Sequence, residues 1–230
     1  MKKRSKRYRA SGSQKELQTA RAVGAAVECL LCMPKAKFDE TVELSFHLDV
    51  DPKQGDQMVR GIVRLPHGNG KMLRVLAFTS SPEVALEAGA THAGLNDLIA
   101  QIEGGWFDFD VAVATTAAMK EVRSVAKILG PKGLMPSPKS GTVGDDIVSI
   151  IREVLAGRCE FKMDKTANVA IAVGKRSFTK EALEANINEA LAALARARPA
   201  AAKGVFVKSA ALSATMSPSI AVEVRTLFAA

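Results

Sequence analysis

The segment that most constrains the fold lies just past the middle of the chain, at residues 130–143. It reads Gly-Pro-Lys-Gly-Leu-Met-Pro-Ser-Pro-Lys-Ser-Gly-Thr-Val and contains three glycines, three prolines and two lysines but no acidic residue. Because proline lacks a backbone N–H and glycine tolerates positive φ, neither a helix nor a strand is expected here. The composition predicts a rigid, positively charged surface loop between two helices, of the kind that meets a ligand.

Charge is distributed unevenly along the 230 residues, whose net charge is +8. Residues 67–157 hold 8 Lys and Arg against 10 Asp and Glu, whereas the flanking residues 1–66 and 158–230 together hold 24 against 14. The first nine residues include six basic ones: Lys2, Lys3, Arg4, Lys6, Arg7 and Arg9. Such a run is either a solvated tail or a nucleic-acid contact. The two ends of the chain therefore predict a basic surface.

Composition also limits where such a protein works. No apolar run approaches the roughly 18 residues that span a bilayer, and the basic N-terminus leads into no apolar signal core. Three cysteines, Cys29, Cys32 and Cys159, are too few and too scattered for a disulfide framework, which fits a reducing compartment. We expect a cytoplasmic protein without a membrane partner.

Hydrophobic periodicity differs between the ends and the middle. The ends predict helices at about 13–33 and from 178 onward, and strands at about 41–50, 58–65, 159–163, 169–173 and 204–212. The middle predicts apolar strands at 73–78 and 111–114 among helices starting at 82 and spanning 96–103, 116–129 and 145–156. Strands that alternate with helices indicate a parallel sheet.

The expected fold class is thus an α+β discontinuous domain built from both termini, with an inserted α/β domain that is Rossmann-like and has a parallel sheet. We place the terminal domain at 1–66 plus 158–230 and the inserted domain at 67–157. Gly68, Gly70 and Gly157 would give the two crossings the flexibility of a hinge.

Motifs of catalysis and cofactor binding are missing from the sequence. Lys71 and Lys175 both lack the glycine and hydroxyl spacing of a P-loop, and no G-x-G-x-x-G occurs. Cys29 and Cys32 form a C-x-x-C at the end of a predicted helix, where burial is a better explanation than redox chemistry. We expect no enzyme activity, metal or cofactor. A nucleotide-dependent α/β enzyme and a thiol redox protein are the alternatives.

The loop at 130–143, led in by Val125-Ala126-Lys127-Ile128-Leu129, resembles the signature of the L-one family of bacterial large-subunit ribosomal proteins, the RNA-binding proteins of the mobile stalk. Three further segments match the RNA-facing parts of that family. The residues that the resemblance assigns to RNA binding are Lys37, Phe38, Thr41, Glu43, Lys162, Asp164, Lys165, Thr166, Thr215, Met216 and Ser217. Lys132 and Lys139 of the loop would add weaker contacts. Positions 167 and 217 are usually glycine in the family pattern and are Ala167 and Ser217 here.

The resemblance also implies a function. It implies a structural constituent of the large ribosomal subunit, a monomer when free, that binds large-subunit ribosomal RNA. It further implies a part in the release of tRNA from the exit site and repression of translation of its own mRNA. The residue types fit RNA: lysine neutralises phosphate, phenylalanine offers a planar face, and threonine and glutamate bond sugar hydroxyls.

Overall fold

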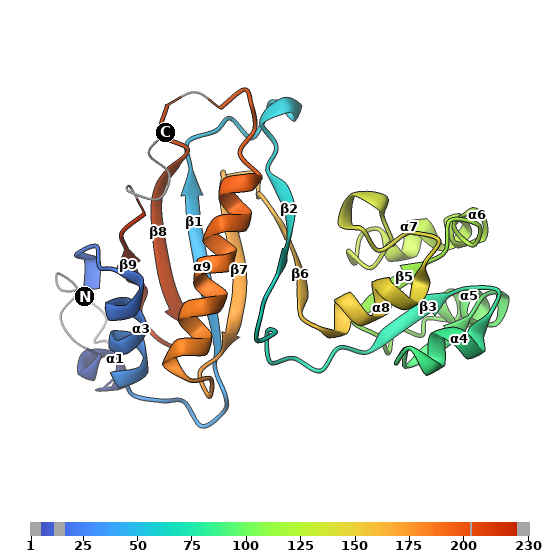
Figure 1. Ribbon diagram of the computed structural model, residues 1–230, viewed down its shortest axis with the longest axis horizontal. Helices are drawn as coiled ribbons and strands as arrows, with labels where there is room; N and C mark the ends of the chain where they lie inside the picture. Colours follow the sequence, from blue (N-terminus) through green and yellow to red (C-terminus); the bar gives the residue numbers. More distant parts are fainter. Residues whose placement is uncertain (1–5, 12–16, 203, 225–230) are drawn as a thin grey trace. The chain divides into compact units, whose positions relative to one another are not determined.

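The computed structural model describes residues 6–11, 17–202 and 204–224, apart from the side chain of Lys139. Contacts between residues divide the chain into two compact units (Figure 1). The terminal unit consists of residues 1–70 and 159–230, and the inserted unit of residues 71–158. From the sequence, the two crossings between the units were expected near residues 67 and 157.

The terminal unit is built on a four-stranded antiparallel sheet with the strand order β7-β1-β8-β9. Its strands are β1 (Thr41–Leu48), β7 (Asn168–Lys175), β8 (Val207–Ala214) and β9 (Ile220–Val222). Figure 1 shows α9 (Lys180–Arg196) lying over β1 and β7, with α3 (Val23–Cys32) on the side of β8 and β9. Val42, Leu44, Phe46 and Leu48 are buried, so every second residue of β1 enters the core.

Smaller elements complete the terminal unit. A two-stranded sheet pairs β2 (Arg60–Arg64) with β6 (Arg158–Lys162), and α1 (Lys6–Ala10) and η1 (Gly55–Gln57) are short helices. The N-terminus of α9 is capped by Thr179, whose Oγ1 accepts from Ala182 N at 3.3 Å.

The first predicted helix is not continuous. Its expected start at Ser13 lies outside the described residues, and the helix is interrupted at residues 19–22 before α3 begins. At this break Arg21 N donates to Ala221 O at 3.1 Å, and Glu223 N donates to Arg21 O at 2.8 Å. The backbone of Arg21 therefore bonds the edge strand β9 instead of its own helix, and the prediction of one helix over 13–33 is wrong.

The inserted unit holds a three-stranded parallel sheet with the order β4-β3-β5. The strands are β3 (Val75–Phe78), β4 (His92–Gly94) and β5 (Val111–Ala114). One face packs against α5 (Asn96–Glu103), α6 (Met119–Val122), η2 (Arg123–Val125) and α7 (Ala126–Leu129), and the other against α4 (Pro82–Glu87) and α8 (Ile147–Leu155). All four residues of β3 are buried. The expected fold class is confirmed.

Two details of the inserted unit differ from the sequence prediction. The helix expected over 116–129 is divided by the 3₁₀ turn η2, and β4 was not foreseen. The segment 130–143 also contains short regular structure, although neither a helix nor a strand was expected there. It contains the 3₁₀ turn η3 (Pro138–Ser140), a bridge from Val143 to Ala114, and two buried residues, Pro136 and Ser140.

The conformation of this loop depends on Arg158. Arg158 Nη2 donates to Ser140 O at 3.0 Å, and Nη1 pairs with Glu153 at 2.5 Å. Gly141 has φ 62°, and a Cβ placed there would lie 1.8 Å from Arg158 Nη2. The positive φ therefore favours glycine at position 141, and any other side chain would also displace the Arg158 guanidinium.

Candidate nucleic-acid interface

One face of the four-stranded sheet is open. Directly paired residues share a face. Those that face away from α9 and α3 are Thr41, Glu43, Ser45 and His47 on β1, Asn168, Ala170, Ala172 and Lys175 on β7, Ser209, Ala211 and Ser213 on β8, and Ala221 on β9. None of these residues is buried. Apart from Glu43, His47, Asn168 and Lys175, their side chains are small, and none is a Phe, Tyr or Trp. The face is therefore shallow and lets a large ligand approach the backbone.

Two of the expected RNA-facing segments meet at one end of this open face. Thr41 N donates to Thr215 Oγ1 at 3.0 Å, and Thr215 N donates to Thr41 O at 3.1 Å. Lys175, which was not among the expected RNA-binding residues, donates from Nζ to Thr41 Oγ1 at 2.8 Å. Glu43 follows on the same face, between Ala172 and Ser213.

Two large apolar side chains are exposed at the same end. Met216 follows Thr215 and is 60% exposed, and Phe38 precedes Thr41 and is 54% exposed. Lys37 beside Phe38 is also exposed. Ser217 closes the turn after β8, because Ala214 N donates to Ser217 Oγ at 2.8 Å and Ser217 N donates to Ala214 O at 3.0 Å. Its φ is not positive, so position 217 does not require glycine in this fold.

The third expected segment lies at the opposite end of the open face. Thr41 pairs with Lys175, at one end of β7, whereas His47 pairs with Asn168, at the other, where its Nδ1 lies 2.8 Å from Asn168 Oδ1. The turn between β6 and β7 precedes Asn168 and exposes Lys162 and Lys165. The structure therefore brings residues 41 and 215 together and places residues 162–166 at the far end of the same sheet.

Asp164 shapes this turn. Its Oδ1 accepts from Asn168 N at 2.7 Å and from Thr166 N at 2.8 Å, and its Oδ2 accepts from Thr166 Oγ1 at 2.8 Å. The hydrogen bond from Asn168 N, followed by that from Thr166 Oγ1, lowers the pKa of Asp164. Ala167 occupies the position that favours glycine, with φ 61°. Asp164 and Thr166 thus use their polar atoms to hold Lys165 at the tip.

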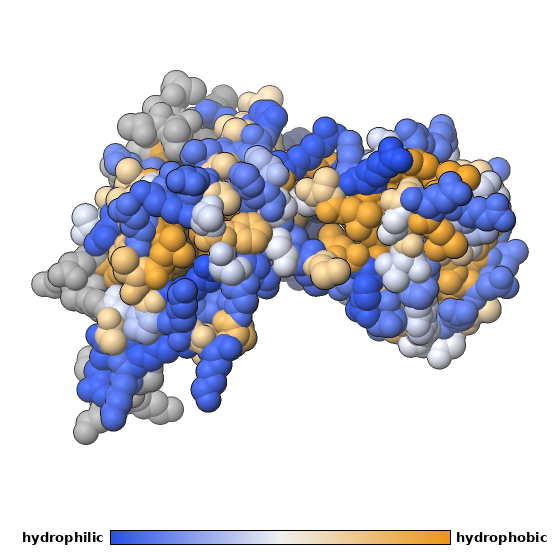
Figure 2. Space-filling view, turned by 60° about the horizontal axis from the view of Figure 1, so that its bottom comes forward, coloured by the Kyte–Doolittle hydropathy of each residue, from blue (hydrophilic) through white to orange (hydrophobic). Residues whose placement is uncertain are grey.

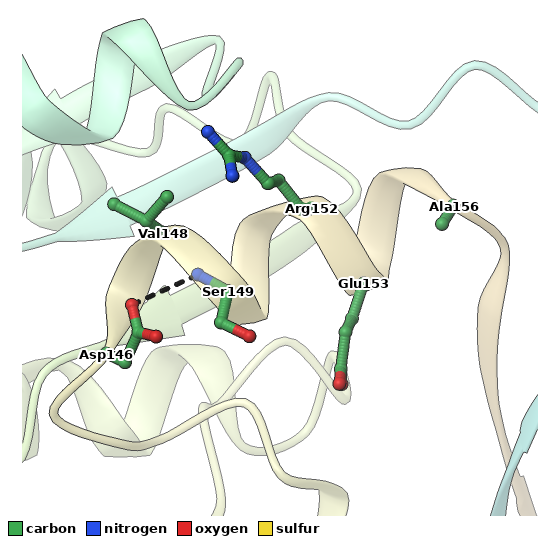
Figure 3. A pocket seen from close by; sticks show the side chains of 6 residues that line it. All are labelled: Asp146, Val148, Ser149, Arg152, Glu153 and Ala156. Carbon is green, nitrogen blue, oxygen red and sulfur yellow. Dashed lines mark hydrogen bonds between the residues drawn. The ribbon is translucent and has the colours of Figure 1, made fainter.

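The inserted unit offers a less open surface. Lys132, an expected secondary contact, places Nζ 3.2 Å from the centroid of the Phe107 ring, and the side chain of Lys139 lies outside the described residues. Figure 3 shows a depression lined only by residues of α8 and its cap, where Asp146 Oδ1 accepts from Ser149 N at 3.2 Å. This bond caps the helix, and no second element contributes a side chain to that lining.

Three observations on the described part of the chain concern metal binding, membrane insertion and thiol chemistry. Within it, no group of three His, Cys, Asp or Glu could hold a metal ion, and no helix is long and apolar enough to cross a membrane. Cys29 and Cys32 are free thiols at the end of α3. Cys29 packs against the core, but Cys32 is exposed, so the burial expected for both is wrong for Cys32. Burial raises the pKa of the third thiol, Cys159, which makes it less reactive.

The two units differ in charge as well as in topology. The terminal unit carries 23 Lys and Arg against 14 Asp and Glu, and the inserted unit 9 against 10. In the view of Figure 2, the terminal unit is largely hydrophilic around a smaller hydrophobic area, whereas hydrophobic residues occupy more of the inserted unit. Fold and surface define a two-unit α/β protein. Its basic unit contains an antiparallel sheet and is interrupted in sequence by a unit that contains a parallel sheet.

The chain belongs to the ribosomal protein L1p/L10e family, whose model matches residues 30–218. It is 46% identical over 223 residues to the large ribosomal subunit protein uL1 of Protochlamydia amoebophila, covering 96% of this chain and 94% of the relative. The protein of the same name from Kosmotoga olearia is 46% identical over 222 residues and 96% of each chain. That of Chlamydia trachomatis is 43% identical over 231 residues and the full length of both. Family membership agrees with the expectation of a non-enzymatic protein.

Proposed function

We propose that this protein is a constituent of the large ribosomal subunit and binds large-subunit ribosomal RNA through the open face of its terminal unit. The observation that carries the proposal is that the uncovered sheet face belongs to the more basic unit of a ribosomal protein family member. Covered on both sides, the parallel sheet of the inserted unit offers no comparable surface.

The chemistry of the open face favours recognition of RNA shape. Ser45, Ser209 and Ser213 present hydroxyls that can bond ribose 2′-OH groups and phosphates, and Glu43 can accept from a 2′-OH or a base amino group. The alanines between them leave room for the wide, shallow minor groove of an RNA helix. A face without Phe, Tyr or Trp side chains does not suit the stacking of successive unpaired bases. The preferred target is therefore a folded RNA segment.

The two ends of the face supply affinity. Lys37 at one end and Lys162 and Lys165 at the other neutralise phosphates and release counterions, so binding weakens as salt rises. Phe38 and Met216 offer exposed apolar surface to a ribose or to a base that is displaced from its stack. Asp164, Thr166 and Ser217 act indirectly, because their hydrogen bonds fix the two turns.

The family resemblance also implies two finer roles, repression of the protein's own mRNA and release of tRNA from the exit site. A segment of the protein's own mRNA that folds like the ribosomal site would compete for the open face, which would repress translation when ribosomal RNA is scarce. Release of tRNA from the exit site would use the protein as part of the assembled subunit. We assign the free protein to the cytoplasm as a monomer.

Domain dissection tests the proposal. Residues 1–70 joined to 159–230 should retain most of the affinity of the full chain for large-subunit ribosomal RNA, and residues 71–158 alone should bind weakly. Affinity is measured by filter binding across a salt titration, with an unrelated duplex RNA as control. Tighter binding by residues 71–158 than by the joined terminal unit would overturn the assignment, as would equal affinity of the full chain for the two RNAs.

A further inference from the structure

A buried carboxylate lies directly behind one end of the open face. Glu40 immediately precedes Thr41, and its side chain is fully buried. Arg7 Nη2 donates to its Oε1 at 2.7 Å, and Arg176 Nη1 donates to its Oε2 at 2.5 Å. Burial acts to raise the pKa of Glu40, but the hydrogen bonds from Arg176 and Arg7, together with their charges, outweigh it and lower the pKa. Glu40 is therefore a buried, charged group between two guanidinium groups.

Arg176 connects this carboxylate to the end of α3. Its Nη1 also donates to Pro34 O at 3.2 Å, and its Nη2 donates to Leu30 O at 3.0 Å and to Met33 O. These carbonyls close α3 and begin the connection to β1. Arg176 N in turn donates to Glu40 O at 2.8 Å. The connection that carries Lys37 and Phe38 is thus fixed at both ends by one arginine.

Arg7 connects the same carboxylate to the turn after β8. Besides Glu40, its Nη2 donates to Met216 O at 2.9 Å. Arg7 belongs to the basic N-terminal run, for which the sequence allowed a solvated tail or a nucleic-acid contact. Instead its guanidinium is directed into the protein, and its side chain is only 29% exposed. One carboxylate therefore connects α1, the approach to β1, the end of β7 and the turn at Met216.

We propose that Glu40, held between Arg7 and Arg176, is a positioning residue that sets the orientation of Phe38 and Met216 for RNA, and that Arg7 supports it from within the protein rather than by pairing with a phosphate. The inference rests on the proposed function, because the residues that Glu40 positions are those expected to contact RNA. It adds that one member of the basic run increases affinity without forming an ion pair with RNA.

The substitution Glu40→Gln separates positioning from simple charge. Removing a negative charge close to a polyanion should tighten RNA binding if electrostatics alone matters. Loss of the charge-assisted bonds that orient the neighbouring segments should instead weaken binding by about tenfold. We expect the weaker binding, measured with purified large-subunit ribosomal RNA. Binding that is unchanged or tighter, in a variant whose circular dichroism matches the wild type, would overturn the inference.

The substitution Arg7→Met provides a second test at a partly exposed site, should Glu40→Gln fail to fold. The matched control is Arg9→Met, which removes the same charge two residues away from an exposed side chain. If Arg7 is a positioning residue, Arg7→Met should weaken binding about tenfold, several times more than Arg9→Met, and leave the salt dependence of binding unchanged. If Arg7 pairs with phosphate, the salt dependence of binding should be weaker in Arg7→Met: the magnitude of the slope of log affinity against log salt should decrease by about one. That result would show that the inference is wrong.

The wild-type chain distinguishes failure of the proposed RNA-binding function from failure of the positioning role. If it does not prefer ribosomal RNA to an unrelated duplex, the proposed function itself fails. If it shows that preference while Arg7→Met and Arg9→Met lose equal affinity, the proposed function stands and only the positioning role is wrong.

Discussion

The two sheets of this protein show how the covering of a sheet determines its use. In the terminal unit, β1 buries every second residue, so one face forms the core and the other remains open. In the inserted unit, β3 is buried along its whole length because helices cover both faces of the parallel sheet. The open sheet can therefore accept substitutions that alter binding without altering stability, while the covered sheet has no such freedom.

The largest expected effect comes from placing a carboxylate on each sheet. Ala211 lies in the open face opposite Ser45, and Ala77 lies in the centre of β3. Ala211→Glu should weaken RNA binding about a hundredfold through repulsion of phosphates. Its free energy of unfolding should change by only about 0.5 kcal/mol. Ala77→Glu should destabilise the inserted unit by roughly 4 kcal/mol or more, because it buries an unpaired charge.

Filter binding and chemical denaturation of both variants check this prediction, with Ala211→Ser as the control that keeps the side chain small and uncharged. A normal RNA affinity for Ala211→Glu would show that the open face is not the binding surface. An inserted unit that tolerates Ala77→Glu would contradict the contrast between the sheets.

A medium effect concerns the acid stability of the inserted unit. Hydrogen bonds from Lys71 Nζ at 2.7 Å and from Arg74 N at 3.2 Å lower the pKa of Asp110 to about 2. Because the folded-state pKa lies below the ordinary value of 3.8, the carboxylate stabilises the fold above that pH and loses its contribution as the pH falls toward 2. Asp110→Asn should therefore cost roughly 1 kcal/mol at pH 7 and only a small part of that near pH 2.

The single tryptophan makes this measurement specific to one unit. Trp106 lies in the inserted unit, with its ring centroid 5.7 Å from that of Phe109. Denaturation followed by its fluorescence at several pH values reports the stability around Asp110. A stability difference between Asp110→Asn and the wild type that persists unchanged at pH 2 would contradict the assignment.

The smallest effect is expected at Ala167, in the turn at the far end of the open face. Alanine has φ 61° there, a conformation that glycine adopts without the steric cost. Ala167→Gly should stabilise the terminal unit by about 0.5 kcal/mol, because relief of strain slightly exceeds the lost burial of one methyl group. The control Ala170→Gly, in the strand that follows, should destabilise. A lower Tm for Ala167→Gly would show that the turn is not strained.

Elements with strong local patterns could be predicted from the sequence. The alternation over Thr41–Leu48, the apolar run Val111–Ala114 and the periodicity of Asn96–Glu103 gave β1, β5 and α5. The short strands β4 and β9 were missed, because three residues are too few to show a period. The interruption of the first helix was missed because its cause, the edge of β9, lies about 200 residues away along the chain.

The candidate site was less accessible to sequence reasoning. Thr41 and Thr215 are 174 residues apart, and only the family resemblance connected them. The small residues of the open face do carry a signal, since serine and alanine alternate with buried aliphatic residues along β7 and β8. The role of Arg7 had no such signal, because a basic residue that binds a buried carboxylate and one that stays in solvent look alike in sequence.

The position of β1 in the middle of its sheet has a consequence for the order of folding. Its neighbours β7 and β8 begin only at Asn168 and Val207. β1 therefore cannot pair with either strand until most of the polypeptide has been synthesised. Residues 71–158 form one continuous stretch and can fold earlier. A growing chain still attached to its ribosome therefore lacks the surface that would recognise RNA until its last strands have emerged.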